Sequence, residues 1–302
     1  MSHQDASVKS IIFALTANFG IAITKTIAAV LTGSGAMLAE SIHSFADCGN
    51  QGLLFLGLSA SKKEADIEHP LGHGKSIYFW SFIVALMLFS MGGLFSIYEG
   101  VHKLGSSEEL KSPMIAIIVL SVSILLEGAS LLGCIKQINK LRHNESLWSW
   151  IKNTRQSELV VVLGEDIAAL FGLAFALLSV ILSVVTGNPV YDAIGSIGIG
   201  VLLVIVSFFL ATKVKSLLIG QSADEETRTA IKQMLEARPE VEQVYNLITL
   251  QLGAQIMVAV KAKMTNTDSA EQLIENINIC EMELRKAYTN VQWIFFEPDN
   301  KD

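Results

Sequence analysis

Six apolar stretches, each long enough to cross a lipid bilayer, constrain the fold of this chain more than any other feature. They cover residues 10–31, 36–60, 77–101, 113–136, 158–186 and 190–217. A membrane-spanning helix needs about 20 mainly apolar residues. Charged residues make up only 17% of the chain, whereas a typical soluble domain has about 25%. The sequence therefore predicts an all-α bundle of six transmembrane helices.

The remaining residues, 218–302, are charged and predict a separate soluble domain. Ser222 is followed by acids, which is typical of a residue that caps the start of a helix. Gly253 separates two segments with strand character, and apolar residues alternate in the second of them. The expected elements are a helix at 222–237, strands at 241–252 and 254–264, a helix at 271–288 and a strand at 291–296. This αββαβ order predicts a small α+β domain with helices on a sheet.

Lysines and arginines are distributed unevenly among the connections, which predicts the orientation of the spans. One side has only Lys103 and Lys111; the other has Lys9, Lys62, Lys63, Lys75, Lys136, Lys140, Arg142, Lys152, Arg155, Lys213 and Lys215. We therefore expect both termini and the tail domain in the cytoplasm. No removable signal peptide is apparent, and a bacterial inner membrane is the expected location. The net charge of −7 argues against a nucleic-acid partner.

Polar residues interrupt the second apolar stretch at helical spacing. Glu40, His43, Asp47, Asn50 and Gln51 fall on one face of a helix. Ionisable groups at membrane depth are costly and usually face a protein interior or a watery path. His43 and Asp47, one turn apart, offer a nitrogen and an oxygen that can hold a divalent cation together. The alternative is a polar face that only packs against neighbouring helices.

Among the other ionisable residues of the apolar stretches, four lie well away from the ends of a stretch. Glu165 and Asp166 are adjacent in the fifth stretch, Glu127 stands alone in the fourth, and Lys25 lies in the first. We expect Lys25 to pair with a buried carboxylate. Glu127 could carry protons, support a ligand, form a structural pair or bind a metal itself.

Three motifs stand out along the chain. The second stretch contains Ala39-Glu-Ser-Ile-His-Ser-Phe-Ala-Asp47, the next loop contains Glu68-His-Pro-Leu-Gly-His-Gly-Lys75, and the fifth stretch contains Glu165-Asp166. These motifs resemble those of the cation diffusion facilitators, a family of proton-coupled exporters of zinc and related metals, and the loop motif is close to the family signature H-x-x-G-H-G-K. The resemblance covers essentially the whole chain. Gln51 and the residues around Glu165 resemble the branch that includes the mitochondrial zinc transporter of animals.

The resemblance implies a transport site made by the second and fifth spans. It assigns His43, Asp47 and Asp166 as metal ligands. The family often has a histidine four residues before that aspartate, where this chain has Val162. Glu165 is the expected substitute; alternatively it supports another ligand or bonds to a neighbouring helix. Replacing an imidazole nitrogen by a carboxylate oxygen gives the site a harder set of ligands, and such a set tolerates Mn²⁺ or Fe²⁺ better.

The resemblance also implies a second metal site and a homodimer. Asp66, His69 and His73 match positions at which the family can bind a second metal at the membrane surface. The alternative is a solvated loop that leads into the third span. All histidines precede residue 218, so we expect the tail to dimerise through apolar strand and helix faces without a metal bridge.

The sequence therefore predicts a metal antiporter rather than an enzyme, with a membrane domain at 1–217 and a cytoplasmic dimerisation domain at 218–302. Its partners are divalent metal ions, the lipid bilayer and a second copy of the chain. Zn²⁺ is the expected substrate, with Mn²⁺, Fe²⁺, Co²⁺, Ni²⁺ and Cd²⁺ as alternatives. Protons are the coupling ion because they compete with metal for the ligands. An intramembrane metalloenzyme, the competing class, typically needs an HExxH motif, and here only HxxxD occurs.

Overall fold

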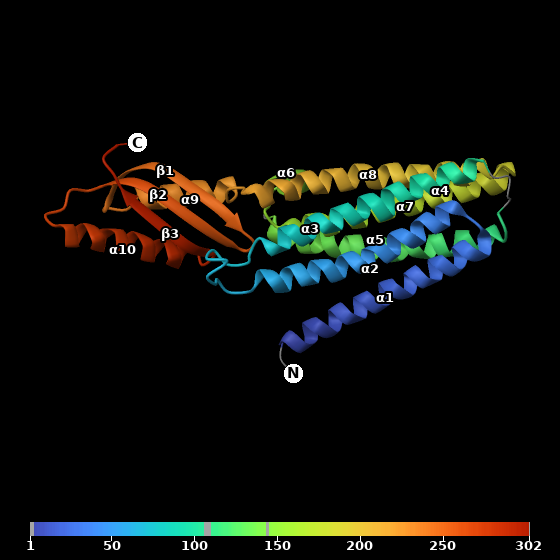
Figure 1. The fold of residues 1–302 in the computed structure, drawn as a ribbon, viewed down its shortest axis with the longest axis horizontal. Helices are drawn as coiled ribbons and strands as arrows, with labels where there is room; N and C mark the ends of the chain where they lie inside the picture. Colours follow the sequence, from blue (N-terminus) through green and yellow to red (C-terminus); the bar gives the residue numbers. More distant parts are fainter. Residues whose placement is uncertain (1–2, 106–109, 143–144, 302) are drawn as a thin grey trace. The chain divides into compact units, whose positions relative to one another are not determined.

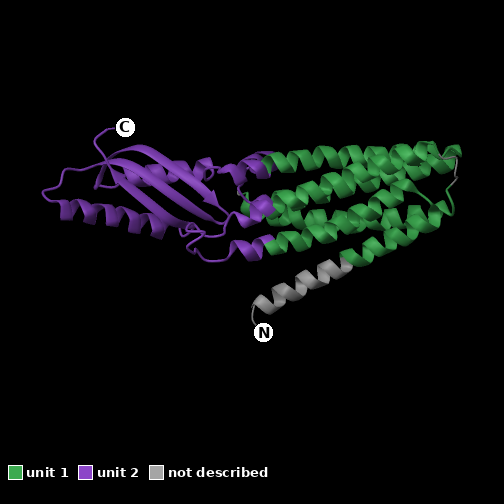
Figure 2. Cartoon of the chain, viewed as in Figure 1, with its two compact units in different colours: residues 1–56, 80–144, 158–213 green, residues 57–79, 145–157, 214–302 purple. Residues whose placement is uncertain are grey.

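The computed structural model describes residues 18–105, 110–142 and 145–301 in full, and residues 3–17 as helical backbone. The chain forms two compact units, each built from separate segments (Figure 2). The first contains residues 1–56, 80–144 and 158–213, and the second contains residues 57–79, 145–157 and 214–302. The second unit therefore combines the tail with two connections between the apolar helices.

The predicted spans all fall on helices (Figure 1). These are α1 (His3–Thr32), α2 (Gly35–Ser61), α5 (Pro113–Leu141), α7 (Ser157–Thr186) and α8 (Val190–Ile219), with the third span divided into α3 (Ser76–Met87), the π-helix η1 (Leu88–Leu94) and α4 (Phe95–Leu104). Among the residues that the structure describes, four helices are long and apolar enough to cross a membrane: Ser76–Leu104, α5, α7 and α8. α2 is almost as long but carries the polar stripe, and the described apolar part of α1, Asn18–Thr32, is shorter.

Glycines allow α8 to approach the third span closely. A Cβ atom on Gly200 would lie 2.7 Å from the carbonyl oxygen of Gly93, and one on Gly100 would lie 2.7 Å from that of Ala193. Backbones this close leave no room for a larger side chain, which is a common way of packing membrane helices. α5 is the least buried of the four long apolar helices, since only 17% of its most apolar 18-residue segment is buried inside the protein.

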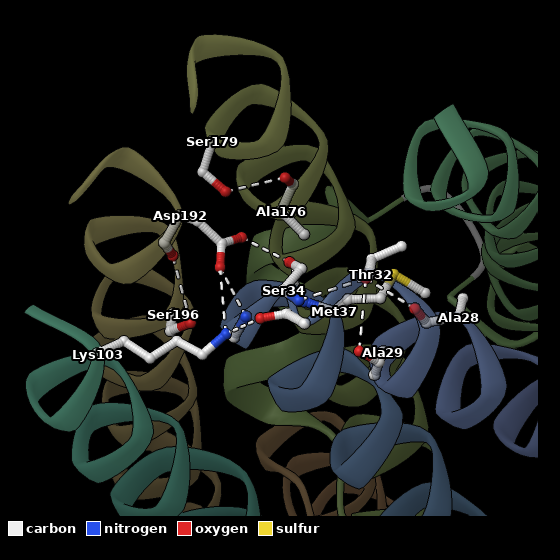
Figure 3. A network of polar contacts seen from close by, with 12 residues as sticks. Ala28, Ala29, Thr32, Ser34, Met37, Lys103, Ala176, Ser179, Asp192 and Ser196 are labelled. Carbon is white, nitrogen blue, oxygen red and sulfur yellow. Dashed lines mark hydrogen bonds and ion pairs between the residues drawn. The ribbon is translucent and has the colours of Figure 1, made fainter. Parts of the chain in front are cut away.

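One buried carboxylate joins three elements at an end of the bundle (Figure 3). Asp192, in the first turn of α8, accepts hydrogen bonds from Ser34 Oγ at 2.5 Å and from the backbone N–H of Gly35 at 2.6 Å. The ammonium of Lys103 on α4 lies 3.8 Å from the same carboxylate and also donates to the carbonyl of Gly33. The α1–α2 turn, α4 and α8 are thereby held together through one acid.

The tail has the predicted order of a helix, two strands, a helix and a strand. These are α9 (Glu225–Glu236), β1 (Val241–Leu252), β2 (Gln255–Met264), α10 (Ala270–Ala287) and β3 (Val291–Pro298). β1 and β2 pair antiparallel across a turn in which Gly253 has a φ of +66°. β2 and β3 pair parallel, which requires a crossover such as α10. The predicted helix start was wrong: Asp224, not Ser222, caps α9 by accepting from the N–H of Thr227.

The sheet has one covered face and one open face. The covered face and the two helices form an apolar core, which includes Ile231, Leu235, Val244, Ile256, Val258, Val260, Ala262, Cys280 and Leu284. On the open face, Ile248, Ala259 and Phe295 are register partners across the three strands. Ile248 and Phe295 are each 56% exposed. The tail is therefore a two-layer domain with an apolar row on its uncovered side.

The two connections in the second unit contact the tail. The backbone N–H of Gly253 donates to the hydroxyl of Tyr78 at 3.0 Å, and a Cβ atom on Gly74 would overlap the carbonyl of Leu252. In the other connection, Arg155 follows the short helix α6 (Leu147–Asn153) and donates to the carbonyl of Ser222 at 2.7 Å. In both bonds a side chain of the connection contacts a backbone group of the tail.

Candidate metal sites

Most of the polar stripe of α2 lies inside the bundle, and only its last residue, Gln51, is exposed. Glu40, His43 and Asn50 are fully buried, and the side chain of Asp47 is 18% exposed. The Nε2 atom of His43 lies 3.6 Å from Oδ2 of Asp47. The helical spacing of these two residues therefore brings an imidazole and a carboxylate together, as the sequence predicts.

Glu40, at the start of the stripe, has a cationic partner on α1. Lys25 is fully buried, and its ammonium lies 3.3 Å from Oε2 of Glu40 and donates to Oγ of Ser44 at 2.7 Å. The prediction that Lys25 pairs with a buried carboxylate is confirmed. Part of the stripe thus joins α1 to α2, whereas His43 and Asp47 are not engaged by this pair.

α7 places Glu165 and Asp166 beside α2 and α5. The side-chain amide of Asn50 donates to Oε1 of Glu165 at 2.6 Å, so Glu165 makes the bond between helices that the sequence left as one of its alternatives. Asp166 accepts a hydrogen bond from the hydroxyl of Ser130 on α5. The two acids therefore have different neighbours, although they are adjacent in the chain.

Side chains from four helices line one pocket in the bundle. They are Asn18 and Ile21 of α1, Ser44, Asp47 and Gln51 of α2, Glu127 and Ser130 of α5, and Val162, Glu165, Asp166 and Ala169 of α7. Three of the predicted ligands, Asp47, Glu165 and Asp166, thus face the same space. Val162 faces it too but offers no donor atom. His43 does not line the pocket, but its imidazole contacts Asp47, which does.

Several polar atoms around this pocket are buried without a hydrogen-bond partner: Nδ1 and Nε2 of His43, Oδ1 of Asp47, Oδ1 of Asn50 and Oδ2 of Asp166. Such atoms are rare in folded proteins and costly, so their clustering fits a site that a cation completes. The side chains are not gathered at coordination distance. Within the described part of the bundle, no three His, Cys, Asp or Glu residues bring ligand atoms within 4.8 Å of one another.

Glu127 and Ser130 are pocket residues that the sequence motifs did not identify. They lie three residues apart on α5, and both face the pocket. The available signal was a single acid in an apolar span. That signal shows that the residue is unusual, but it does not show which helix the residue faces.

The second predicted site lies on the loop between α2 and α3. Oδ1 of Asp66 is 3.3 Å from Nδ1 of His69, and Oδ2 is 3.7 Å from Nε2 of His73. One ligand atom from each residue lies within 4.8 Å of the other two. The backbone N–H of His69 donates to Asp66 at 2.6 Å and lowers the pKa of this carboxyl below its usual range. A charged carboxylate and two imidazoles are a ligand set that suits Zn²⁺.

Comparison with known proteins identifies relatives of this chain. Residues 11–219 match the family model described as the cation efflux transmembrane domain. The human mitochondrial proton-coupled zinc antiporter SLC30A9 is 36% identical over 234 residues, which are 76% of this chain and 41% of that protein. Metal tolerance protein C4 of Arabidopsis thaliana is 35% identical over 249 residues, which are 82% of this chain and 54% of that protein.

A more distant relative matches over most of its length. The magnetosome protein MamB of Magnetospirillum gryphiswaldense is 26% identical over 262 residues, which are 86% of this chain and 83% of that protein. By contrast, the chain spans only 41% of the human protein and 54% of the plant protein. The resemblance drawn from the three motifs is confirmed. This chain is an integral membrane protein that belongs to the cation efflux family, a family of transporters rather than enzymes.

Proposed function

We propose that this protein is a proton-coupled antiporter that exports divalent cations, with Zn²⁺ as its principal substrate. The observation that supports this is the pocket in which Asp47, Glu165 and Asp166 face one another, beside the unpartnered imidazole of His43. The likeness to a protein named as a proton-coupled zinc antiporter favours the same ions.

Exchange follows from the chemistry of these side chains. His43 binds a metal through a ring nitrogen that carries no proton, and Asp47 and Asp166 bind through charged oxygens. Protons and metal therefore compete for the same atoms. Protons that reach the site release the metal, and metal that reaches it displaces protons, so an inward proton gradient drives export.

The direction of transport follows from the orientation of the chain. We assign six spans within a membrane domain at 1–217, and a cytoplasmic domain at 218–302. The uneven distribution of lysine and arginine supports this orientation. Both termini then lie in the cytoplasm, and the assigned location is a bacterial inner membrane.

An exporter of Mn²⁺ or Fe²⁺ is the second candidate, and Val162 is the observation that favours it. This residue lines the pocket without offering a donor, so most donors around the pocket are oxygens. Oxygen-rich sites suit harder cations, although zinc binds N/O sites more tightly in the usual order of affinities. Co²⁺, Ni²⁺ and Cd²⁺ are further alternatives.

Metal uptake into proteoliposomes tests the proposed transport. Uptake of Zn²⁺, Mn²⁺, Fe²⁺, Co²⁺, Ni²⁺ and Cd²⁺ is measured one ion at a time, with and without an imposed pH gradient. We expect Zn²⁺ to move fastest and the gradient to accelerate it, and we expect Asp47→Ala to abolish uptake. Flux that ignores the gradient would contradict proton coupling, and full flux in Asp47→Ala would contradict the site.

The choice of metal is tested at Val162. Val162→His places an imidazole at the pocket wall, and we expect the ratio of Zn²⁺ to Mn²⁺ uptake to rise. Val162→Leu is the matched control, since it changes the side chain without adding a donor. Equal ratios in both variants would show that this position does not contact the transported ion.

Asp66, His69 and His73 form a second cation site in our proposal, supported by the proximity of their ligand atoms. Replacing all three by alanine is expected to lower the number of Zn²⁺ ions bound per chain by one in equilibrium dialysis. Glu68→Ala is the control, because this neighbouring acid lies outside the cluster. An unchanged number in the triple variant would show that the loop does not bind Zn²⁺.

The homodimer is also a proposal, and the open face of the tail sheet supports it. The row formed by Ile248, Ala259 and Phe295 is apolar, its two large side chains are exposed and Ala259 is partly buried, and a second copy of the chain would cover it. Ile248→Asp is expected to shift the purified protein from dimer to monomer in light scattering. Ile274→Asp, at an equally exposed position on α10, serves as the control.

A further inference from the structure

A cation that enters the proposed transport site loses water ligands, and the site offers few donor atoms to replace them. His43, Asp47 and Asp166 can each offer one, Val162 offers none, and one oxygen of Glu165 is engaged by Asn50 at 2.6 Å. Tetrahedral Zn²⁺ needs four ligands, and octahedral Mn²⁺ needs about six. Together with the other oxygen of Glu165 these residues offer four donors, which suffice for tetrahedral Zn²⁺ but leave an octahedral ion two donors short, to be supplied by protein or by water.

Glu127 of α5 faces the same pocket from a helix that carries none of the predicted ligands. Its neighbours Leu125 and Leu126 are 74% and 47% exposed, so they lie on the outer, apolar side of α5. Ser130, three residues further on, bonds to Asp166. One face of α5 is thus directed at the carboxylate of α7, and Glu127 is the acid on that face.

The charges around the pocket also require compensation. Glu127 is a like-charge neighbour of both Asp47 and Asp166. Charged carboxylates repel one another strongly in surroundings of low dielectric. Among the residues that the structure describes, Glu127 belongs to no ion pair, and Lys25 is already paired with Glu40. A divalent cation held between the carboxylates would balance their charge.

The orphaned imidazole gives an independent indication of a ligand. His43 is fully buried, both of its ring nitrogens lack a hydrogen-bond partner, and Nε2 is directed at the carboxylate of Asp47. An imidazole in this state is suited to metal binding. His43 therefore indicates a cation site independently of the acids that line the pocket.

We infer that Glu127 is a ligand of the transported cation, so that α2, α5 and α7 together build the site. This inference rests on the proposed function, because it adds a residue to the same site. With Glu127 included, His43 is the single nitrogen donor among several carboxylates. Such a set binds Zn²⁺ and also admits the harder ions Mn²⁺ and Fe²⁺.

Metal binding to the full-length protein tests the role of Glu127. Asp66, His69 and His73 are first replaced by alanine so that the loop does not contribute. In isothermal titration we expect Glu127→Gln to weaken Mn²⁺ and Zn²⁺ binding at least tenfold. Glu99→Gln is the matched control: this acid on α4 is also partly buried but does not line the pocket, and its binding should equal that of the parent protein.

Replacing Glu127 by a different metal-binding residue distinguishes metal coordination from its other possible roles. Glu127→His keeps a donor at the position, so we expect it to bind Zn²⁺ and to raise the ratio of Zn²⁺ to Mn²⁺ affinity above that of the parent protein. A residue that only carries protons or packs helices would give no such change in preference. An unaltered ratio in Glu127→His would therefore overturn the inference.

The outcomes for Asp47 and Glu127 are read together. If Asp47→Ala loses binding while Glu127→Gln binds like the parent, the ligand role of Glu127 is wrong and the proposed transport site stands. If neither variant changes binding, the transport site itself is wrong. If Glu127→Gln binds normally but uptake no longer responds to a pH gradient, Glu127 carries protons and is not a ligand.

A measurement on the unmodified chain covers the case in which the variants fail to fold. Carbodiimide labelling of carboxyl groups is followed by mass spectrometry, with and without Mn²⁺ or Zn²⁺. We expect metal to protect Glu127 together with Asp47 and Asp166, and to leave Glu99 unprotected. Equal labelling of Glu127 in both conditions, with Asp47 protected, would overturn the inference.

Discussion

Lys25 and Glu40 are both fully buried and contact each other at 3.3 Å. Removing one partner of a buried ion pair leaves an uncompensated charge and typically costs about 3–5 kcal/mol, whereas replacing both by apolar residues is often neutral. The pair therefore joins α1 to α2 at a position where each residue depends on the other.

We expect Lys25→Met to lower the thermal unfolding temperature of the purified protein, because Glu40 loses its only cationic contact in the described bundle. The double variant Lys25→Met/Glu40→Leu should recover most of the loss. Differential scanning fluorimetry in detergent measures both. A double variant less stable than Lys25→Met would show that the two residues are not coupled in this way.

Cys280 is 1% exposed in the core of the tail. Burial raises the pKa of its thiol to about 11. Only the thiolate reacts with alkylating reagents, and a raised pKa means less thiolate at any given pH below it. We expect iodoacetamide to label Cys280 slowly at pH 8 in the native protein and rapidly in urea, as measured by peptide mass spectrometry. Rapid native labelling would contradict this packing.

The proximity of His43 and Asp47 could be predicted from the sequence because local spacing decides it, whereas Asp166 was expected at the site only from the family resemblance. Two residues four apart on a helix must be neighbours whatever surrounds the helix. Glu127 could not be assigned, since the face that α5 directs at α7 depends on tertiary packing. Val162 shows the same limit: the motif located the position, but only the structure shows that it lines the pocket.

At the scale of elements, close helix packing depends on small residues. Gly200 of α8 faces the backbone of Gly93 so closely that a Cβ atom would lie 2.7 Å from its carbonyl oxygen. Backbone cannot move away as easily as a flexible side chain, so a methyl group there forces the two helices apart. Overpacking of this kind typically costs about 1–3 kcal/mol.

We therefore expect Gly200→Ala to destabilise the protein and to reduce uptake in proteoliposomes. Gly133→Ala on α5 is the matched control, because the added methyl group would meet no described atom of another helix within 4 Å. Unfolding temperature and uptake are measured for both variants. Equal behaviour of the two variants would show that α8 and the third span have room to separate.

Element limits in the tail were predictable because strand alternation and turn glycines are local signals. β1 covers the predicted residues, and β2 and α10 begin within one residue of the predicted starts. The cap of α9 was mispredicted for a tertiary reason. Ser222 is held by Arg155, which donates to its carbonyl, and the helix starts only after Asp224. Arg155 and Ser222 are 67 residues apart in the chain, so local sequence patterns do not reveal their contact.

At the scale of the whole molecule, the tail and two connections form one compact unit. Tyr78 links one connection to the β1–β2 turn by accepting from the N–H of Gly253. We expect Tyr78→Phe to accelerate amide hydrogen exchange at Gly253. Tyr245→Phe, which removes a hydroxyl bonded to the carbonyl of Asn300, is the control and should leave Gly253 unchanged. Equal exchange in both would contradict the contact.

The composite origin of this unit has a practical consequence for how the protein is dissected. A fragment cloned from residue 218 onward keeps every strand of the sheet but discards the partners of Gly253 and Ser222. The solubility and metal binding of such a fragment will therefore reflect newly exposed backbone groups as well as the properties of the native tail. Grafting residues 57–79 back through a designed linker would restore part of what the cut removes.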